Sequence, residues 1–133
     1  MRSQALPAAT ARAQGIDGSR QRLGVDVLDL VQFYWHDYSN KNYVPAALHL
    51  ADLQAKGKIN QVGVTNFDVA RLSEIVDAGV TVVSNQVQFS LLDPRPDNGM
   101  VEYCAQKGIA LLPYGTVAGG FLTGAYAGKQ PSE

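Results

Sequence analysis

Hydrophobic residues gather in four short runs along the chain, and polar, turn-forming residues bound each run. The runs are residues 27–35, 59–64, 80–88 and 109–112, and they are rich in Val, Ile, Leu and aromatic residues. Short apolar runs of this length are typical of buried strands. We therefore expect four strands, the first of them buried on both faces.

The segments between these runs follow the helical period. Ala46, Leu50 and Leu53 fall on one stripe of a segment that extends from about residue 43 to 56. We expect helices there, from Asp68 to Gly79, and over residues 98–107, with the last turns of another at residues 16–24 that stop at Gly24. Asn42 and Asp68 are the residue types that cap helix N-termini.

One pattern of helix, glycine and strand occurs three times, as "AKGKINQVGV", "DAGVTVVSNQV" and "QKGIALLPYG". A glycine after a helix accepts a left-handed turn, which lets the chain reverse into the next strand. Strands that alternate with helices favour parallel pairing through right-handed crossovers. The pattern predicts an α/β fold with a parallel sheet, and it fits both a barrel and an open doubly wound sheet.

Composition narrows the class of protein. The 133 residues carry a net charge of -1, so the chain has no basic surface for nucleic acid. No apolar stretch approaches the ~20 residues of a membrane helix. The single cysteine, Cys104, excludes an internal disulfide and fits a reducing, cytoplasmic location; we expect it to be a buried structural thiol. We expect residues 1–15 to be disordered or a frayed helix, 16–126 to form the domain, and 127–133 to be a flexible tail. Two histidines and one cysteine are too few for a metal site.

Polar and aromatic side chains cluster where the predicted strands end, which is where parallel α/β folds place their chemistry. Ser84, Gln86 and Gln88 alternate and so share one face, where buried amides need a protein, water or ligand partner. His36 follows the first strand and is either an acid or a surface histidine. Residues 115–120 are glycine-rich and suit a phosphate, but they lack the Walker lysine and the dinucleotide-binding spacing.

Four motifs, in order between Arg22 and Gly124, resemble the aldo-keto reductases. They are "RLGVDVLDLVQFYWHDYS", "GKINQVGVTNFD", "VSNQVQFSLLD" and "LLPYGTVAGGFLTG". The resemblance implies a (β/α)8 barrel, of which this chain would supply about strands four to seven. It also implies an oxidoreductase that transfers a hydride between NADP(H) and an aldehyde or ketone.

The resemblance also implies a cofactor site. In the family, a Ser/Thr-Asn pair and a glutamine contact the nicotinamide carboxamide, and these correspond to Thr65, Asn66 and Gln86. A tyrosine that stacks on the nicotinamide ring corresponds to Tyr114. The residues expected near the pyrophosphate are Gly115, Thr116, Val117 and Gly119. This assignment requires Thr65, Gln86 and Tyr114 to point to the same side of the sheet.

The sequence departs from the family in two ways. Tyr34 stands where the family has its active-site histidine, and His36 follows two residues later, on the same face if the strand continues that far. The family's catalytic tyrosine, aspartate and lysine belong to earlier strands, so we expect this chain alone to have no useful turnover. The expected partners are a small carbonyl substrate and, through open sheet edges, further copies of the chain, with no nucleic acid and no membrane. The alternative is a non-catalytic half-barrel module that self-associates or binds a nucleotide or a partner.

Overall fold

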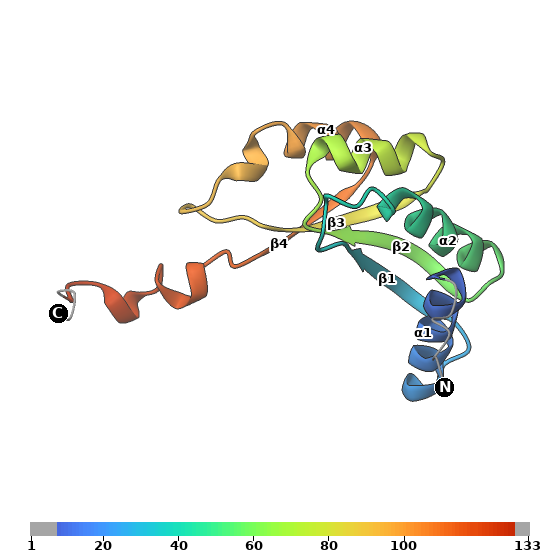
Figure 1. The fold of residues 1–133 in the computed structure, drawn as a ribbon. Helices are drawn as coiled ribbons and strands as arrows, with labels where there is room; N and C mark the ends of the chain where they lie inside the picture. The colour runs from blue at the N-terminus through green and yellow to red at the C-terminus, as the bar shows by residue number, and fades with distance from the viewer. Residues whose placement is uncertain (1–7, 130–133) are drawn as a thin grey trace.

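A computed structural model describes residues 8–129 as a parallel four-stranded sheet with helices between the strands (Figure 1). The strands lie side by side in the order β1-β2-β3-β4. This arrangement confirms the predicted α/β fold. The elements are α1 (Ala8–Leu23), β1 (Leu28–Tyr34), α2 (Tyr43–Ala55), β2 (Ile59–Thr65), α3 (Val69–Asp77), β3 (Val82–Gln88), α4 (Met100–Lys107) and β4 (Ala110–Tyr114).

Helices α2, α3 and α4 cover one face of the sheet, and the hydrophobic core lies between them and the strands (Figure 1). The predicted stripes of α2 and α3 point into this core, because Leu50, Leu53, Leu72 and Ile75 are all buried. Cys104 on α4 is buried as well, as expected. The helices of residues 8–129 are all too short or too polar to span a lipid bilayer.

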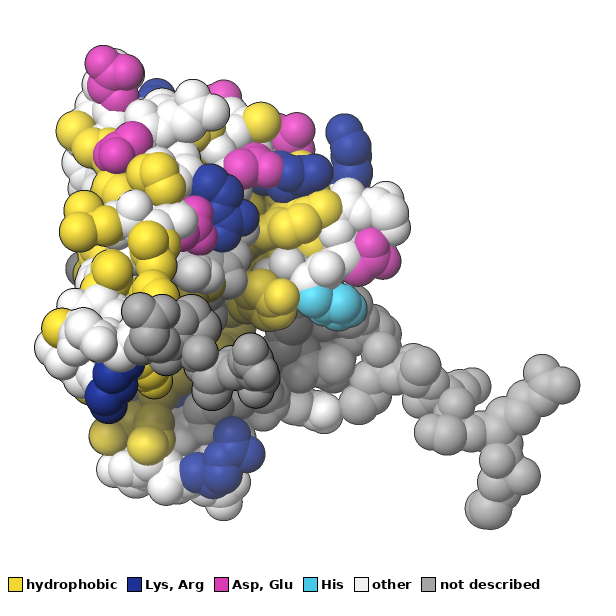
Figure 2. Space-filling model, turned by 90° about the vertical axis from the view of Figure 1, so that its left-hand side faces the viewer, with side chains coloured by type: hydrophobic (Ala, Val, Ile, Leu, Met, Phe, Trp, Pro, Cys, Tyr) yellow, Lys and Arg dark blue, Asp and Glu magenta, His cyan; other side chains and the backbone are white. Residues whose placement is uncertain are grey.

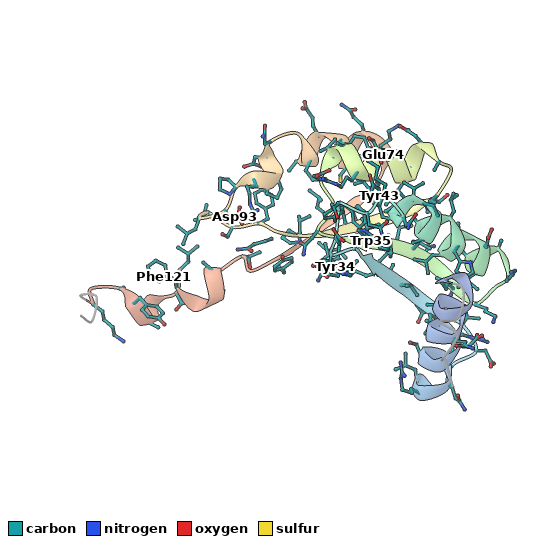
Figure 3. All side chains as sticks on the ribbon, in the orientation of Figure 1. Tyr34, Trp35, Tyr43, Glu74, Asp93 and Phe121 are labelled. Atoms are coloured by element: carbon teal, nitrogen blue, oxygen red, sulfur yellow. The ribbon has the colours of Figure 1, made fainter. Side chains whose placement is uncertain are left out.

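The opposite face of the sheet, which we call the open face, is not covered by any helix among residues 8–129. Leu30 on β1 is 41% exposed and Tyr34 is 57% exposed, whereas Phe33 between them packs in the core. In Figure 3, Tyr34 and Tyr43 lie on opposite sides of the sheet. The prediction that the first strand is buried on both faces is therefore wrong, because the layer that would cover the second face is not part of the described chain.

Helix ends follow the local sequence in most places. Gly57 and Gly108, which follow α2 and α4, have left-handed φ angles of 70° and 68°, as the repeated pattern predicted. The Asp68 carboxylate accepts a hydrogen bond from the Arg71 backbone N–H at 2.9 Å, so Asp68 caps α3. Asn42 makes no such bond, because its ψ of 8° lies outside the extended region that a capping side chain needs.

Several predicted boundaries moved. The helix expected from residue 98 begins at Met100, because Gly99 has a φ of 87° that a right-handed helix cannot contain. A short 3-10 helix, η1 (Arg95–Asp97), occupies the loop before it. The third strand begins at Val82 instead of residue 80, and the fourth extends to Tyr114.

The first and last described segments extend beyond the sheet (Figure 1). Helix α1 begins at Ala8, so part of the segment expected to be disordered or frayed is helical, while residues 1–7 lie outside the described residues. After β4 the chain runs away from the sheet through η2 (Ala118–Gly120) and η3 (Gly124–Tyr126), shown in red in Figure 1. Residues 130–133 of the expected tail also lie outside the described residues.

Candidate functional site

The strand register brings the predicted site residues to one face of the sheet. Thr65 pairs with Tyr34 on one side and with Gln86 on the other, so these three side chains form one row. Gln86 pairs with Leu112, and Tyr114 lies two residues further along β4. Because side chains repeat every two residues, Thr65, Gln86 and Tyr114 all point to the open face. The arrangement therefore meets the geometric condition that the cofactor assignment requires.

Asn66 connects the ends of three strands. It lies just after β2 with a left-handed φ of 59°, a conformation that asparagine tolerates better than most residues. Its backbone N–H donates to the Gln86 carbonyl at 2.9 Å. Its side-chain Oδ1 accepts a hydrogen bond from the Tyr114 hydroxyl at 3.0 Å, and its backbone carbonyl accepts one from Tyr38 at 3.1 Å.

Thr65 makes a contact that the sequence analysis missed. Its hydroxyl donates to Oε1 of Gln32 at 2.9 Å, and Gln32 lies on the open face of β1. The signal was available in the alternation along β1, because Gln32 precedes Tyr34 by two residues and shares its face. Gln32 therefore fixes the hydroxyl orientation of a predicted site residue.

Two polar side chains of β3 are left without partners among the described residues. The Ser84 Oγ is buried and makes no hydrogen bond. Gln86 is half-buried, and none of the side-chain hydrogen bonds found within residues 8–129 involves its amide. The sequence analysis left open whether a protein, water or ligand group pairs with this row of β3. The described residues supply no protein partner for Ser84 Oγ or the Gln86 amide. The half-buried Gln86 amide therefore keeps its hydrogen-bonding capacity for a group outside the described residues, whereas Ser84 Oγ is enclosed.

A cavity of 560 Å³ lies at the ends of the strands. Its lining residues include Asn66, Gln88 and Tyr114 from the strand ends and Arg95, Asn98 and Met100 from the segment that leads into α4. Figure 2 turns this side of the molecule toward the viewer, and hydrophobic side chains reach the surface there among charged ones. Arg95 is paired with Asp93 through two contacts of 2.6 Å, which raise the pKa of Arg95 and lower the pKa of Asp93.

His36 lies beyond the strand row to which Tyr34 belongs. β1 ends at Tyr34, so the strand does not continue far enough to place His36 on the same face. The indole N–H of Trp35 donates to the carbonyls of Asp37 at 2.8 Å and Asn40 at 3.0 Å, which folds the following loop back. Both Tyr34 and His36 line a second cavity, of 610 Å³, between β1, α1 and α2.

The glycine-rich loop leaves the sheet directly after Tyr114. Gly115, Ala118 and Gly119 have left-handed φ angles of 67°, 49° and 65°. The backbone N–H groups of Thr116 and Val117 donate to no acceptor within the described chain. Neither described cavity is lined by Gly115, Thr116, Val117 or Gly119, nor by Thr65 or Gln86.

The sequence was compared with protein-family models and with curated proteins. The model of the aldo/keto reductase family matches residues 8–133. The chain is 30% identical over 112 residues to an NADH-specific methylglyoxal reductase of Escherichia coli, covering 82% of this chain and 34% of that protein. It is 33% identical over 122 residues to a chloroplastic pyridoxal reductase of Arabidopsis thaliana, covering 84% of this chain and 33% of that protein.

Solved structures resemble the fold. A glycerol dehydrogenase from Gluconobacter oxydans matches with a TM-score of 0.81 at 24% identity, over 94% of this chain and 38% of that one. An aldo/keto reductase from Klebsiella pneumoniae in complex with NADP and acetate matches with a TM-score of 0.70 at 26% identity, over 90% of this chain and 42% of that one. The chain therefore spans between a third and a half of the length of these proteins.

Proposed function

The chain belongs to the aldo/keto reductase family, and from this premise we propose that its strand ends bind the nicotinamide end of NADP(H) in an oxidoreductase. The observation that carries the proposal is the shared face of Thr65, Gln86 and Tyr114, next to the linking residue Asn66. The parallel sheet fits a segment of the family's barrel. In such barrels the active sites lie at the carboxyl ends of the strands.

The chemistry of these side chains fits the nicotinamide group. A carboxamide both donates and accepts hydrogen bonds, and the Gln86 amide offers both functions without a partner in the described chain. Asn66 uses only its Oδ1 in the bond to Tyr114, which leaves its Nδ2 hydrogens for an acceptor. The Tyr114 ring is 39% exposed on the open face and offers a flat surface for stacking. None of these three groups carries a charge, in keeping with a neutral carboxamide.

The proposed reaction is the reduction of a carbonyl compound to an alcohol. The bound cofactor supplies the hydride for the carbonyl carbon. Tyr34 replaces the family's histidine, and its hydroxyl, on the same row as Thr65, supports a hydrogen bond to the carbonyl oxygen. The tyrosine that gives its proton to that oxygen, with its aspartate and lysine, belongs to strands that this sequence does not contain. We therefore propose that this chain alone binds the cofactor without useful turnover.

The names of two relatives narrow the substrate class. Methylglyoxal and pyridoxal, which two relatives are named for reducing, both carry an aldehyde group. We propose that the substrate of the whole barrel, to part of which this segment corresponds, is a small aldehyde. The single cysteine supports the cytoplasmic location that is part of the same proposal.

The choice between NADPH and NADH has support on both sides. One relative is named as NADH-specific, and one structural neighbour holds NADP. In the family, the residues that bind the 2′-phosphate follow strand eight, beyond this segment. We propose NADPH, and the binding experiment below compares the two cofactors.

Removal of the Tyr114 ring tests the site. We expect the Tyr114→Ala variant of the whole chain to bind NADPH about fivefold more weakly, because a stacked aromatic pair contributes on the order of 1 kcal/mol. Fluorescence titration with NADPH and with NADH measures the affinity. Tyr126→Ala is the matched control, because Tyr126 packs on Phe121 in the C-terminal segment, away from the strand ends.

Unchanged NADPH affinity in Tyr114→Ala would count against the assigned site. NADPH oxidation that depends on an added aldehyde, above the rate of the Tyr114→Ala variant, would refute the proposed lack of turnover.

A second candidate function is a half-barrel module that pairs with another copy of itself. The exposed open face and the unpaired edges of β1 and β4 within the described chain favour it. Two copies of four strands and four helices match the eight of each in a closed barrel.

A further inference from the structure

The side chain of Asn66 can reach the site only while its backbone keeps an unusual conformation. A left-handed φ of 59° turns the chain sharply at the end of β2 and directs the amide toward β4, where it meets the Tyr114 hydroxyl. Such a conformation persists when surrounding contacts fix it. The Asn66 N–H is fixed by Gln86 and its carbonyl by the Tyr38 hydroxyl.

Tyr38 is itself held firmly in the loop between β1 and α2. Its ring packs edge-on against Phe67, with centroids 5.6 Å apart, and against Tyr43 at 6.0 Å. The Arg71 guanidinium lies over the same ring, 4.4 Å from its centroid. Burial raises the pKa of Tyr38, so its hydroxyl keeps its proton and acts as a donor. The packed Tyr38 ring therefore holds its hydroxyl where it donates a hydrogen bond to the Asn66 carbonyl.

We propose that Tyr38 is a positioning residue, whose hydroxyl holds the Asn66 carbonyl and thereby keeps the Asn66 amide and the Tyr114 ring in place. The expected effect of Tyr38 on NADPH affinity rests on the function proposed above. The expected effect of Tyr38 on the positions of Asn66 and Tyr114 does not depend on a bound cofactor. Tyr38 lies 28 residues from Asn66 in the sequence and does not line either described cavity, so it acts through Asn66 and not on the ligand.

The Tyr38→Phe variant of the whole chain separates the hydroxyl from the ring. Phenylalanine keeps the packing against Phe67 and Tyr43 and removes only the bond to Asn66. We expect the NMR signals of the Asn66 backbone and side-chain amides and of the Tyr114 ring to shift. We also expect NADPH affinity to fall about threefold to tenfold, the range of one neutral hydrogen bond.

Tyr43→Phe is the control for a purely structural effect. Tyr43 belongs to the same aromatic group, and its hydroxyl donates to Glu74, on the covered side of the sheet. This variant should lower the melting temperature and leave the Asn66 and Tyr114 signals in place. A second variant, Asn66→Gly, keeps the left-handed turn, removes the amide, and should shift the Tyr114 signals as Tyr38→Phe does.

Unchanged Asn66 and Tyr114 signals in Tyr38→Phe, or equal shifts in Tyr43→Phe, would overturn the proposal. If the wild-type chain binds no NADPH, the proposed function fails, and the NMR signals alone still decide the role of Tyr38.

Discussion

At the scale of single residues, both sides of the sheet hold paired and unpaired polar groups. On the covered face, the buried Tyr43 hydroxyl on α2 donates to the Glu74 carboxylate on α3 (Figure 3). On the open face, Ser84 Oγ and the Gln86 amide find no partner among the described residues. Buried polar groups are normally paired, but among the described residues Asn85 Oδ1 and the Tyr103 hydroxyl on the covered side also lack partners. The open face differs because the half-buried Gln86 amide is accessible to a further component.

The Tyr43→Phe variant should lower the free energy of unfolding by about 1 kcal/mol, because it removes one hydrogen bond whose acceptor regains water. Urea denaturation at neutral pH measures this. Tyr103→Phe is the matched control, because the buried Tyr103 hydroxyl has no partner among residues 8–129 and its loss should cost little.

The effect of Tyr43→Phe on stability should depend on pH. The bond to Glu74 raises the pKa of Tyr43 to about 12. An unfolded tyrosine has a pKa of about 10, so the folded state holds the proton more tightly between these values. The contribution of Tyr43 is complete below pH 10 and is lost as the pH rises to 12. The stability difference between wild type and Tyr43→Phe should shrink over this range, and a constant difference would contradict the assignment.

At the scale of elements, β2 and β3 approach closely at Gly63. A Cβ at this position would lie 2.4 Å from Ser84 Oγ and 3.4 Å from Cδ1 of Leu30. Gly63 is therefore required here for space, since its φ is not in the left-handed region. The close approach lies below the row of Thr65 and Gln86, where the register between β2 and β3 shifts between Val62 and Val64.

Gly63→Ala should reduce the free energy of unfolding by about 1–3 kcal/mol, the usual cost of overpacking. The double variant Gly63→Ala/Ser84→Ala should recover most of the loss, because it removes the atom that the new methyl group meets. Ser84→Ala alone should be close to neutral, since Ser84 Oγ has no hydrogen bond to lose. A double variant as unstable as Gly63→Ala would contradict this explanation, and thermal unfolding distinguishes the cases.

At the scale of the whole molecule, the described chain is one sheet with one layer of helices. Leu30, Tyr34 and Tyr114 are exposed on the open face, and neither β1 nor β4 has a second neighbour within residues 8–129. Unpaired edges and an uncovered apolar face favour association with further strands. The second candidate function therefore has a measurable consequence.

We expect the wild-type chain to associate with rising concentration and Leu30→Lys to weaken this association by about tenfold or more, since a buried charge is costly. Sedimentation equilibrium measures the mass. Leu48→Lys is the matched control, because Leu48 on α2 is 39% exposed and lies on the helical layer. A monomer at every concentration, or equal effects of the two variants, would exclude pairing through the open face.

The sequence analysis predicted the elements well where the signal is local. The glycines after α2 and α4 and the Asp68 cap depend on one or two turns of chain, and the structure has them as predicted. Asn42 has the same residue preference, but its ψ of 8° does not allow the capping bond. Gln32 and Tyr38 were missed because their partners, Thr65 and Asn66, are distant in the sequence.

The sequence by itself determined that Ser84, Gln86 and Gln88 share one face, because alternation in a strand is a property of the local backbone. Only the tertiary structure decided that Thr65 and Tyr114 lie on that same face, because this follows from the register between strands that are separated by whole helices. It also decided which face is covered. Periodicity records that a side chain is apolar, and burial depends on whether another layer is present to meet it.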